Sequence, residues 1–254
     1  MSTAGVKFAK VSFTPAGGPS ILREISLALA AGTTTALLGR SGSGKTTLLR
    51  TVNGLVRPTS GEVTVNEKNV TSMQSPDEIV ALRRGIGYVI QETGLFPHMT
   101  VERNAGLSLE LDKRPASEIS ARAREMVELV GLDFVGLRGR LPWQLSGGQR
   151  QRVGLARALA LDPPVLLMDE PFGALDPLTR SEMQAIFQAL QQQLHKTVLL
   201  VTHDLGEALT LADRVIIIHQ GEVAADLPAE DVLDSENHHV KEYVSSVKHL
   251  FKSR

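Results

Sequence analysis

Two stretches of this sequence have residue types suited to binding phosphate. The first, GRSGSGKTT, matches the pattern G-x-x-x-x-G-K-[ST] and comprises Gly39, Arg40, Ser41, Gly42, Ser43, Gly44, Lys45, Thr46 and Thr47. Its glycines let successive backbone N–H groups point at phosphate oxygens, and a following helix would present its positive N-terminal end to the same anion. We expect Lys45 to reach the β and γ phosphates of a nucleotide and the Thr46 hydroxyl to bind Mg²⁺.

Two adjacent carboxylates close an apolar run further along the chain. The run is VLLMDE, which ends at Asp169 and Glu170. At the end of a buried strand, Asp169 is placed to hold Mg²⁺, directly or through water, and Glu170 to accept a proton from an attacking water. This pattern predicts in-line attack of water on the γ phosphate, with positioning and charge neutralisation supplying the rate.

Gln91 and His203 each follow an apolar run, in GIGYVIQ and VLLVTH. The carboxyl ends of parallel strands form the edge at which ligands bind in such sheets. There the Gln91 carbonyl could bind Mg²⁺ or the attacking water, and His203 could donate to the γ phosphate. A lone His at a strand end is more often structural, and the phosphate loop on the same sheet favours the functional interpretation.

The second phosphate-like stretch is LSGGQ, residues 145–149. Ser146 is suited to cap a helix, and Gln149, three residues later, to complete a capping box. Gly147 and Gly148 leave the first amides of that helix uncovered, which makes an anion site. From the residues alone, an ordinary capped helix with two incidental glycines stays an open alternative.

The elements that would position these residues alternate between strand and helix patterns. Strands are expected over residues 6–13, 21–29, 33–39, 61–66, 85–91, 163–170, 197–204 and 214–220. Helices are expected over residues 75–84, 117–132 and 205–213, and from Asp176 through a stripe that includes Met183, Phe187 and Leu190. The alternation predicts a mostly parallel sheet with helices on both faces, and residues 92–160 read as a helical insertion.

Composition narrows the classes of function. The chain has 254 residues, 42% hydrophobic and 22% charged, which indicates an ordinary globular domain with a sizeable core. Its net charge of -1 gives no broad basic field, so nucleic acid is not an expected partner. No cysteine is present, which excludes disulfides and thiolate metal sites. No apolar leader and no run approaching the ~20 residues of a membrane helix is found, so a membrane role would come from another chain.

In the order of these motifs the chain resembles the ATP-binding subunits of ABC transporters. GRSGSGKTT corresponds to Walker A, Gln91 to the Q-loop, LSGGQ to the signature, VLLMDE to Walker B, GALD at 173–176 to the D-loop and His203 to the switch histidine. The resemblance implies a head-to-tail pair of chains with ATP between Walker A of one and the signature of the other. It implies that Ser146, Gly147, Gly148 and Gln149 meet the nucleotide of the opposite chain and that Asp176 couples the two sites.

The fold implied is α/β: a P-loop NTPase (RecA-like) core with a mostly parallel sheet, an N-terminal antiparallel β subdomain and an inserted α-helical signature subdomain. We expect one ABC ATPase domain over residues 1–254, with its core at about 1–91 and 161–235 and the helical insertion at about 92–160. Residues from about 236 to 254 are expected to form a short polar tail or surface helix, in which His238 and His239 are solvated.

The adenine contact departs from the family pattern. Relatives often carry an aromatic residue near the first strand that stacks on the base, and here VSFTPAGG offers Phe13, with Pro15 at the place where Tyr often stands. Phe13 is therefore the candidate for stacking, and a place in the core is its alternative.

Within the family, RRGIGYVIQETGLFPHMTVERN and MDEPFGALDPLTR most resemble ATPases that import glycine betaine, carnitine or choline. The resemblance implies ATP and Mg²⁺ as cofactors, a homodimer, integral membrane permease subunits, a separate substrate-binding protein and a place at the cytoplasmic face of the plasma membrane. Neither a C-terminal β domain nor a regulatory CBS module is expected. The alternatives are an importer for another small polar solute, such as an amino acid or polyamine, and an ABC ATPase that acts on the ribosome or DNA.

The loop TGLFPHMTV carries Leu95, Phe96 and Pro97 just after Gln91. We expect it to form part of a groove that binds a short helix of the membrane subunit. Gln91 would couple γ-phosphate binding to that groove. A small local hydrophobic core is the alternative.

Overall fold

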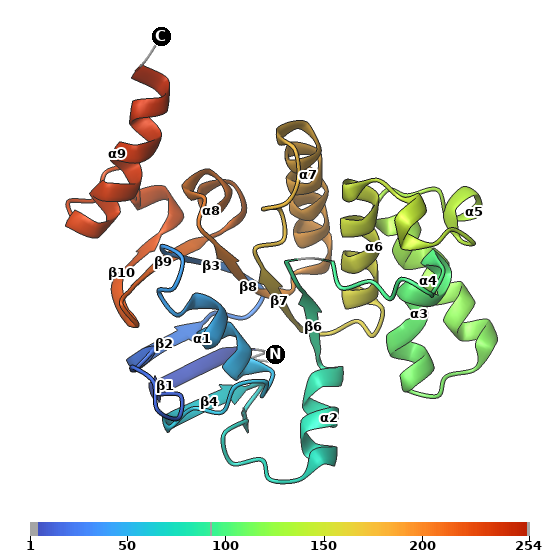
Figure 1. Cartoon of the computed structure of the whole chain (residues 1–254), viewed down its shortest axis with the longest axis horizontal. Coiled ribbons are helices and arrows are strands. Elements are labelled where there is room, and N and C mark those ends of the chain that lie inside the picture. The colour runs from blue at the N-terminus through green and yellow to red at the C-terminus, as the bar shows by residue number, and fades with distance from the viewer. Residues whose placement is uncertain (1–4, 92, 253–254) are drawn as a thin grey trace. The chain divides into compact units, whose positions relative to one another are not determined.

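The computed structural model describes residues 5–91 and 93–252 (Figure 1). The chain forms two compact units. One contains the described residues up to Val80 together with those from Thr197 onward, and the other contains the described residues of Ala81–Lys196. The helix α2 (Pro76–Arg84) includes the point at which the chain passes from the first unit to the second.

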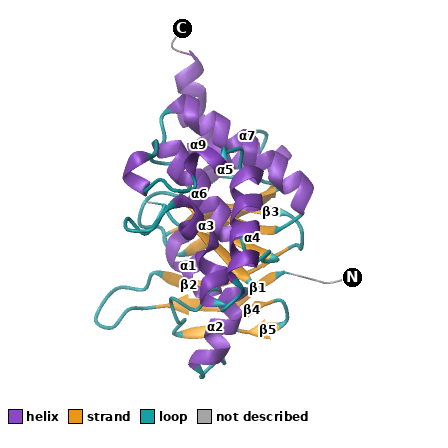
Figure 2. Cartoon of the chain, turned by 90° about the vertical axis from the view of Figure 1, so that its right-hand side faces the viewer, coloured by secondary structure: helices purple, strands orange, loops and turns teal. Residues whose placement is uncertain are grey.

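The first unit contains an antiparallel sheet (Figure 2, strands in orange). Its strands lie in the order β2 (Leu22–Leu29), β1 (Val6–Phe13), β4 (Ser60–Val65) and β5 (Lys68–Asn69). Val6, Phe8 and Val11 of β1 are buried. Because side chains of a strand point alternately to opposite faces, such a pattern buries one face of the sheet and leaves the other polar. This is the antiparallel subdomain that the fold class required.

The same unit contains a second set of strands in the order β10 (Glu222–Pro228), β9 (Arg214–His219), β3 (Thr34–Leu38) and β8 (Thr197–Thr202). β3 runs parallel to both β8 and β9, and β10 is antiparallel to β9. Every residue of β3 and β8 is buried, as expected for parallel strands covered on both faces. Two helices of this unit, α1 (Lys45–Val52) and α8 (Leu205–Leu211), pack against these strands.

The second unit pairs β6 (Ile86–Val89) in parallel with β7 (Val165–Asp169). Its helices are α3 (Val101–Leu111), α4 (Ala116–Leu129), α5 (Phe134–Leu137), α6 (Gly147–Leu159) and α7 (Pro177–Leu194), with a 3₁₀ turn η1 (Pro142–Gln144) ahead of α6. The predicted helix over 117–132 is α4, which buries Ala123, Met126 and Val127, and Gly131 follows its end at φ +74°. α3, α4 and α6 pack against one another.

Two sequence expectations need correction. The strand predicted to end at Gln91 ends at Val89, because the N–H of Thr93 donates to the carbonyl of Ile90 and the chain turns there. The polar C-terminal segment forms the helix α9 (His238–Lys252), which agrees with the expected surface helix and not with a tail, but its residues Val240 and Val244 are buried in a core shared with β9 and α8. The predicted tail is thus anchored in the first unit, and the first unit also includes the 3₁₀ turn η2 (Ala229–Asp231).

Two histidines of α9, His238 and His239, were expected to be solvated and not to bind a metal. The side chain of His238 is exposed and that of His239 is half-buried, and the His239 ring lies 4.4 Å from that of His219 and 4.1 Å from that of His238, measured between centroids. The ring of His239 therefore lies between two other imidazoles, tilted by 36° and 52° to them.

Candidate functional site

The predicted phosphate loop connects β3 to α1 within the first unit. Gly42 and Gly44 have φ of +79° and +104°, in the left-handed region that favours glycine. A Cβ at Gly39 would lie 2.5 Å from the carbonyl oxygen of Ile218 and 2.6 Å from Ser43 Oγ. The loop therefore curls as tightly as the pattern predicts, and a side chain at position 39 would not fit.

Polar groups of this loop are placed to bind an anion. Lys45 is 4% exposed, and its Nζ donates to the carbonyl oxygens of Gly39 at 2.7 Å and Arg40 at 3.0 Å. The hydroxyl of Ser43 is buried without a hydrogen-bond partner, and Gly44, the N-cap residue of α1, supplies no side chain to cap the first amides of the helix. Buried polar groups are seldom left unpaired, and uncovered N-terminal amides bind anions. These features fit a phosphate group.

His203 lies at the same edge of the first unit as the phosphate loop. Leu38, the last residue of β3, pairs with Thr202, the last residue of β8. Because the two strands are parallel, Gly39 and His203 leave the sheet side by side. The placement expected of His203 at a strand's carboxyl end is thus observed.

A hydrogen-bond network that the sequence analysis missed surrounds His203. The hydroxyl of Thr202 donates to Glu207 Oε2 at 2.6 Å and accepts from the N–H of Asp204 at 3.0 Å. Asp204 Oδ1 accepts from the N–H of Glu207 at 3.1 Å, so it caps α8. The D-x-x-E spacing of Asp204 and Glu207 is a capping signal that could have identified this network.

Phe13 ends β1 and is partly buried. Its carbonyl accepts from the N–H of Ile21 at 2.8 Å, and a Cβ at Gly44 would lie 2.9 Å from the carbonyl oxygen of Ile21. The strand end that carries Phe13 is thus connected through Ile21 to the phosphate loop. Stacking of its ring on a base stays a prediction.

Three predicted residues gather in the second unit. Asp169 ends β7 and is 5% exposed, and Glu170 follows it with φ +46°, a left-handed conformation that costs energy for a non-glycine residue. Gln91 Nε2 lies 3.5 Å from Glu170 Oε2, at the limit of a hydrogen bond. The hydroxyl of Tyr88, which the sequence analysis did not single out, donates to Asp169 Oδ2 at 3.4 Å.

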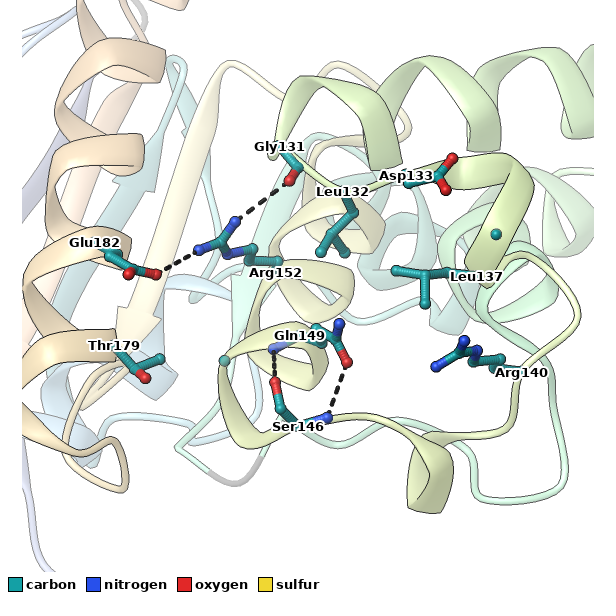
Figure 3. A pocket seen from close by; sticks show the side chains of 12 residues that line it. Gly131, Leu132, Asp133, Leu137, Arg140, Ser146, Gln149, Arg152, Thr179 and Glu182 are labelled. Carbon is teal, nitrogen blue, oxygen red and sulfur yellow. Dashed lines mark hydrogen bonds and ion pairs between the residues drawn. The ribbon is translucent and has the colours of Figure 1, made fainter.

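The signature begins α6 as predicted. The Ser146 hydroxyl accepts from the N–H of Gln149 at 3.2 Å, and the N–H of Ser146 donates to Gln149 Oε1 at 3.0 Å, which completes the capping box (Figure 3). A cavity of about 480 Å³ opens beside this turn. Arg140 extends toward Gln149 from the opposite wall (Figure 3).

The wall formed by α7 joins the signature to the predicted D-loop residue. A Cβ at Gly148 would lie 2.5 Å from Thr179 Cγ2, so α6 and α7 approach closely at their first turns. Asp176 caps α7 by accepting from the N–H of Thr179 at 3.1 Å, and the hydrogen bonding with Thr179 lowers the pKa of Asp176. Arg152 pairs with Glu182 at 3.1 Å one turn further along.

The loop after Gln91 is held by a residue that the sequence analysis also missed. Fully buried Asn104 accepts from the N–H of Phe96 at 2.8 Å, and its Nδ2 lies 3.1 Å from the carbonyl oxygen of Phe96 and 2.9 Å from that of Met99. The side chain of Phe96 is 42% exposed. Its exposure favours a contact surface over the local-core alternative.

Over residues 5–91 and 93–252, no helix has the length and apolar character needed to cross a membrane. In the same residues, no three His, Asp or Glu side chains converge in a cluster able to hold a metal ion.

Comparison with known proteins identifies the family. The ABC transporter family matches residues 22–173. The chain is 46% identical over 225 residues to the choline transport ATP-binding protein OpuBA of Bacillus subtilis, covering 88% of this chain and 57% of that protein. It is 44% identical over 250 residues to the glycine betaine/carnitine/choline transport ATP-binding protein OpuCA of the same organism, covering 98% and 64%. The chain thus spans about three fifths of the length of these relatives.

The sulfate/thiosulfate import ATP-binding protein CysA of Mycobacterium bovis is similarly close. It is 47% identical over 214 residues, which cover 84% of this chain and 59% of that protein. Overall identity therefore does not separate the two substrate classes.

Solved structures agree with the fold. The dimeric ATP-binding cassette MJ0796, in a post-hydrolysis state bound to ADP and Pi, matches with a TM-score of 0.79 and 34% identity, covering 88% of this chain and 98% of that one. The protein cbiO1 of Clostridium perfringens, part of the transporter complex cbiONQ, matches with a TM-score of 0.84 and 28% identity, covering 98% and 99%. The predicted fold class and the resemblance to the osmoprotectant ATPases are confirmed, and the chain belongs to the ABC transporter family as one of its ATP-binding cassettes.

Proposed function

We propose that this chain binds ATP and hydrolyses it to ADP and phosphate. The observation that carries the proposal is the phosphate loop, with its unpaired Ser43 hydroxyl and the uncapped start of α1. In this role Lys45 neutralises the β and γ phosphates, Glu170 accepts the proton of the attacking water, and His203 donates to the γ phosphate. The loop amides from Gly39 to Thr47 bind the remaining phosphate oxygens, and Phe13 is the proposed contact of the base.

Mg²⁺ is the proposed metal cofactor. The donors available for it are the Thr46 hydroxyl, the Gln91 side-chain carbonyl and the Asp169 carboxylate, all of them oxygen atoms, which are the ligands Mg²⁺ prefers. When bound, the ion would neutralise charge on the β and γ phosphates. Tyr88 supports this role because its hydrogen bond to Asp169 helps to orient the carboxylate.

A second copy of the chain is the proposed partner for catalysis. The dimeric state of the cassette MJ0796 supports this assembly. In a head-to-tail dimer, Ser146, Gly147, Gly148 and Gln149 of each chain would bind the nucleotide held by the other chain, and Asp176 would couple the two sites. ATP closes this dimer and hydrolysis resets it.

The hydrolysis is proposed to power import of a quaternary-amine osmoprotectant of the glycine betaine, choline or carnitine type. The identities to OpuBA and OpuCA support this substrate class. The proposed partners are integral membrane permease subunits and a separate substrate-binding protein, and the proposed location is the cytoplasmic face of the plasma membrane. The exposed Phe96 loop is the candidate contact for a permease helix.

A second candidate is an importer for another small solute. The 47% identity to the sulfate/thiosulfate protein CysA favours an inorganic anion within this alternative, alongside the amino acids and polyamines considered from the sequence. The transported solute is expected to contact the partner proteins and not this chain.

One reconstitution experiment separates these substrates. The chain would be reconstituted in ATP-loaded vesicles with the membrane subunits and the binding protein that neighbouring genes encode. Uptake of labelled glycine betaine, choline, carnitine, proline and sulfate would then be compared. The proposal expects saturable, ATP-dependent uptake of a quaternary amine and no uptake of sulfate. Uptake of sulfate alone would replace the proposed substrate, and ATP hydrolysis that drives uptake of none of these solutes would favour an ABC ATPase outside transport.

A further inference from the structure

Arg157 is a charged residue near the end of α6 that has no part in the proposed reaction. Its Nη1 donates to the carbonyl oxygen of Gly94 at 2.7 Å, and its Nη2 donates to the carbonyl oxygen of Thr93 at 2.9 Å. Burial lowers the pKa of Arg157. A desolvated charge is costly unless hydrogen bonds compensate it, so these two carbonyls are an integral part of the environment of Arg157.

The backbone that Arg157 holds is strained. Thr93 and Gly94 have φ of +54° and +55°, so two successive residues lie in the left-handed region, and the first of them is β-branched. A Cβ at Gly94 would lie 2.3 Å from Ile90 Cδ1, so a larger residue there would have to displace the Ile90 side chain in addition to adopting a positive φ. The Thr93–Gly94 dipeptide begins two residues after Gln91, the proposed sensor of the γ phosphate.

α6 approaches this dipeptide closely and reaches the signature at its other end. A Cβ at Gly154, one turn before Arg157, would lie 3.4 Å from the carbonyl oxygen of Thr93. From Arg157 to Ser146 the helix extends over about 16 Å at 1.5 Å per residue. Its first turn is the signature, capped by Ser146 and packed on Thr179 through Gly148.

We propose that Arg157 is a positioning residue that couples the Thr93–Gly94 dipeptide to the signature end of α6. The proposal rests on the proposed function. When Gln91 engages the nucleotide of its own chain, the dipeptide and its two carbonyls shift, the guanidinium follows them, and α6 carries the displacement to Ser146. Nucleotide binding at one site would thereby control whether the signature is positioned to bind the nucleotide of the partner chain.

The test compares Arg157→Gln and Arg157→Lys with the control Arg122→Gln, all in a Glu170→Gln background. Lysine keeps the charge but has one ammonium in place of the two-pronged guanidinium. Arg122 Nε donates to the carbonyl of Ala160 at 3.0 Å, so the control also removes an arginine bound to the α6 region but leaves Thr93 and Gly94 untouched. Folding is checked by thermal melting, ATP affinity of the single chain by titration, and ATP-driven dimerisation by sedimentation.

For Arg157→Gln we expect the dimer dissociation constant with ATP to rise about tenfold. ATP affinity of the single chain should stay within about twofold of the parent, as should both quantities for Arg122→Gln. Arg157→Lys should fall between the parent and Arg157→Gln. A folded Arg157→Gln chain that dimerises like its parent would overturn the proposal, as would an equal loss of ATP affinity and dimerisation, which indicates general damage.

Amide hydrogen exchange of the single chain supplies a measurement that does not need the dimer or the folding of Arg157→Gln. In Arg157→Lys, exchange should accelerate both at Thr93 and Gly94 and at Gln149 and Arg150, whose N–H groups donate to Ser146 in the first turn of α6. Acceleration confined to Thr93 and Gly94, or no acceleration, would refute the coupling. If the Glu170→Gln parent fails to dimerise with ATP, the proposed function fails, and the exchange result still decides the role of Arg157.

Discussion

A Cβ placed on Gly148 would lie 2.5 Å from Cγ2 of Thr179. This distance is shorter than side-chain contacts in folded proteins, so the second glycine of the signature is required by the packing of α6 on α7. The N–H of Thr179 also donates to Asp176 Oδ1. One threonine therefore links the start of the signature helix to the cap of α7.

Substitution of Gly148 tests this packing. Gly148→Ala should lower the free energy of unfolding by about 1–3 kcal/mol, because it overpacks a close helix contact. Thr179→Ser removes the clashing methyl group and keeps the hydroxyl, so the double variant should recover most of the loss in thermal melting. Equal melting temperatures of Gly148→Ala and the unmodified chain would mean that Thr179 can move away from the added methyl group without a loss of stability.

Glu170→Gln tests the proposed base. The amide keeps the shape of the side chain but accepts no proton, so ATP hydrolysis should fall by about 10²–10⁴-fold while ATP binding is retained. Steady-state phosphate release and equilibrium ATP titration measure the two quantities. The exposed residue Glu125, on α4, provides the control Glu125→Gln, which should hydrolyse ATP at the unmodified rate. Turnover near that rate in Glu170→Gln would exclude Glu170 as the principal base.

Ser146→Arg tests whether the signature serves a neighbouring chain. The large cation would obstruct the capped turn without touching the phosphate loop of the same chain, so ATP affinity of the single chain should be unchanged and ATP-driven dimerisation lost. Ser146→Ala removes the cap and the hydroxyl without adding bulk, so it should cost about 1 kcal/mol of stability and weaken ATP-driven dimerisation without abolishing it. Sedimentation with and without ATP distinguishes the two variants. Loss of ATP affinity by the single Ser146→Arg chain would contradict the proposed role.

The cap of α7 should depend on pH. Hydrogen bonding with Thr179 lowers the pKa of Asp176, so its stabilising contribution is complete above the ordinary carboxyl pKa and is lost as the pH falls through the lowered value. Asn is a good cap that does not titrate, so the melting temperature of the unmodified chain should fall relative to Asp176→Asn below about pH 4. A difference between the two proteins that stays constant from pH 7 to this range would refute the assignment.

Phe96→Ala tests the proposed contact with a permease. The exposed ring is presented by a backbone that Asn104 holds, so its removal should leave intact the fold and the ATPase rate measured without membrane subunits, and should reduce ATP-driven uptake in reconstituted vesicles. Leu111, on α3, is 69% exposed and outside this loop, so Leu111→Ala is the matched control and should transport normally. Unchanged uptake by Phe96→Ala would make the coupling role wrong.

Much of the architecture could be predicted from local pattern. The strands β1, β7 and β8 and the helices α4 and α7 follow from alternation, apolar runs and capping residues, and all are observed. Gln91 was wrongly placed at the end of a strand, because periodicity does not register the turn at Ile90. The C-terminal segment reads as polar, and the burial of Val240 and Val244 depends on a core formed by strands distant in sequence.

The sequence by itself determined the phosphate loop, the capping box of Ser146 and Gln149, and the family, because each depends on residues close together in the chain. Only the tertiary structure decided that Tyr88 binds Asp169, that Gly148 packs on Thr179 and that Arg157 holds Thr93 and Gly94. These contacts join segments separated by tens of residues. Their partners are selected by packing and by the need to pair buried polar groups, which local spacing does not encode.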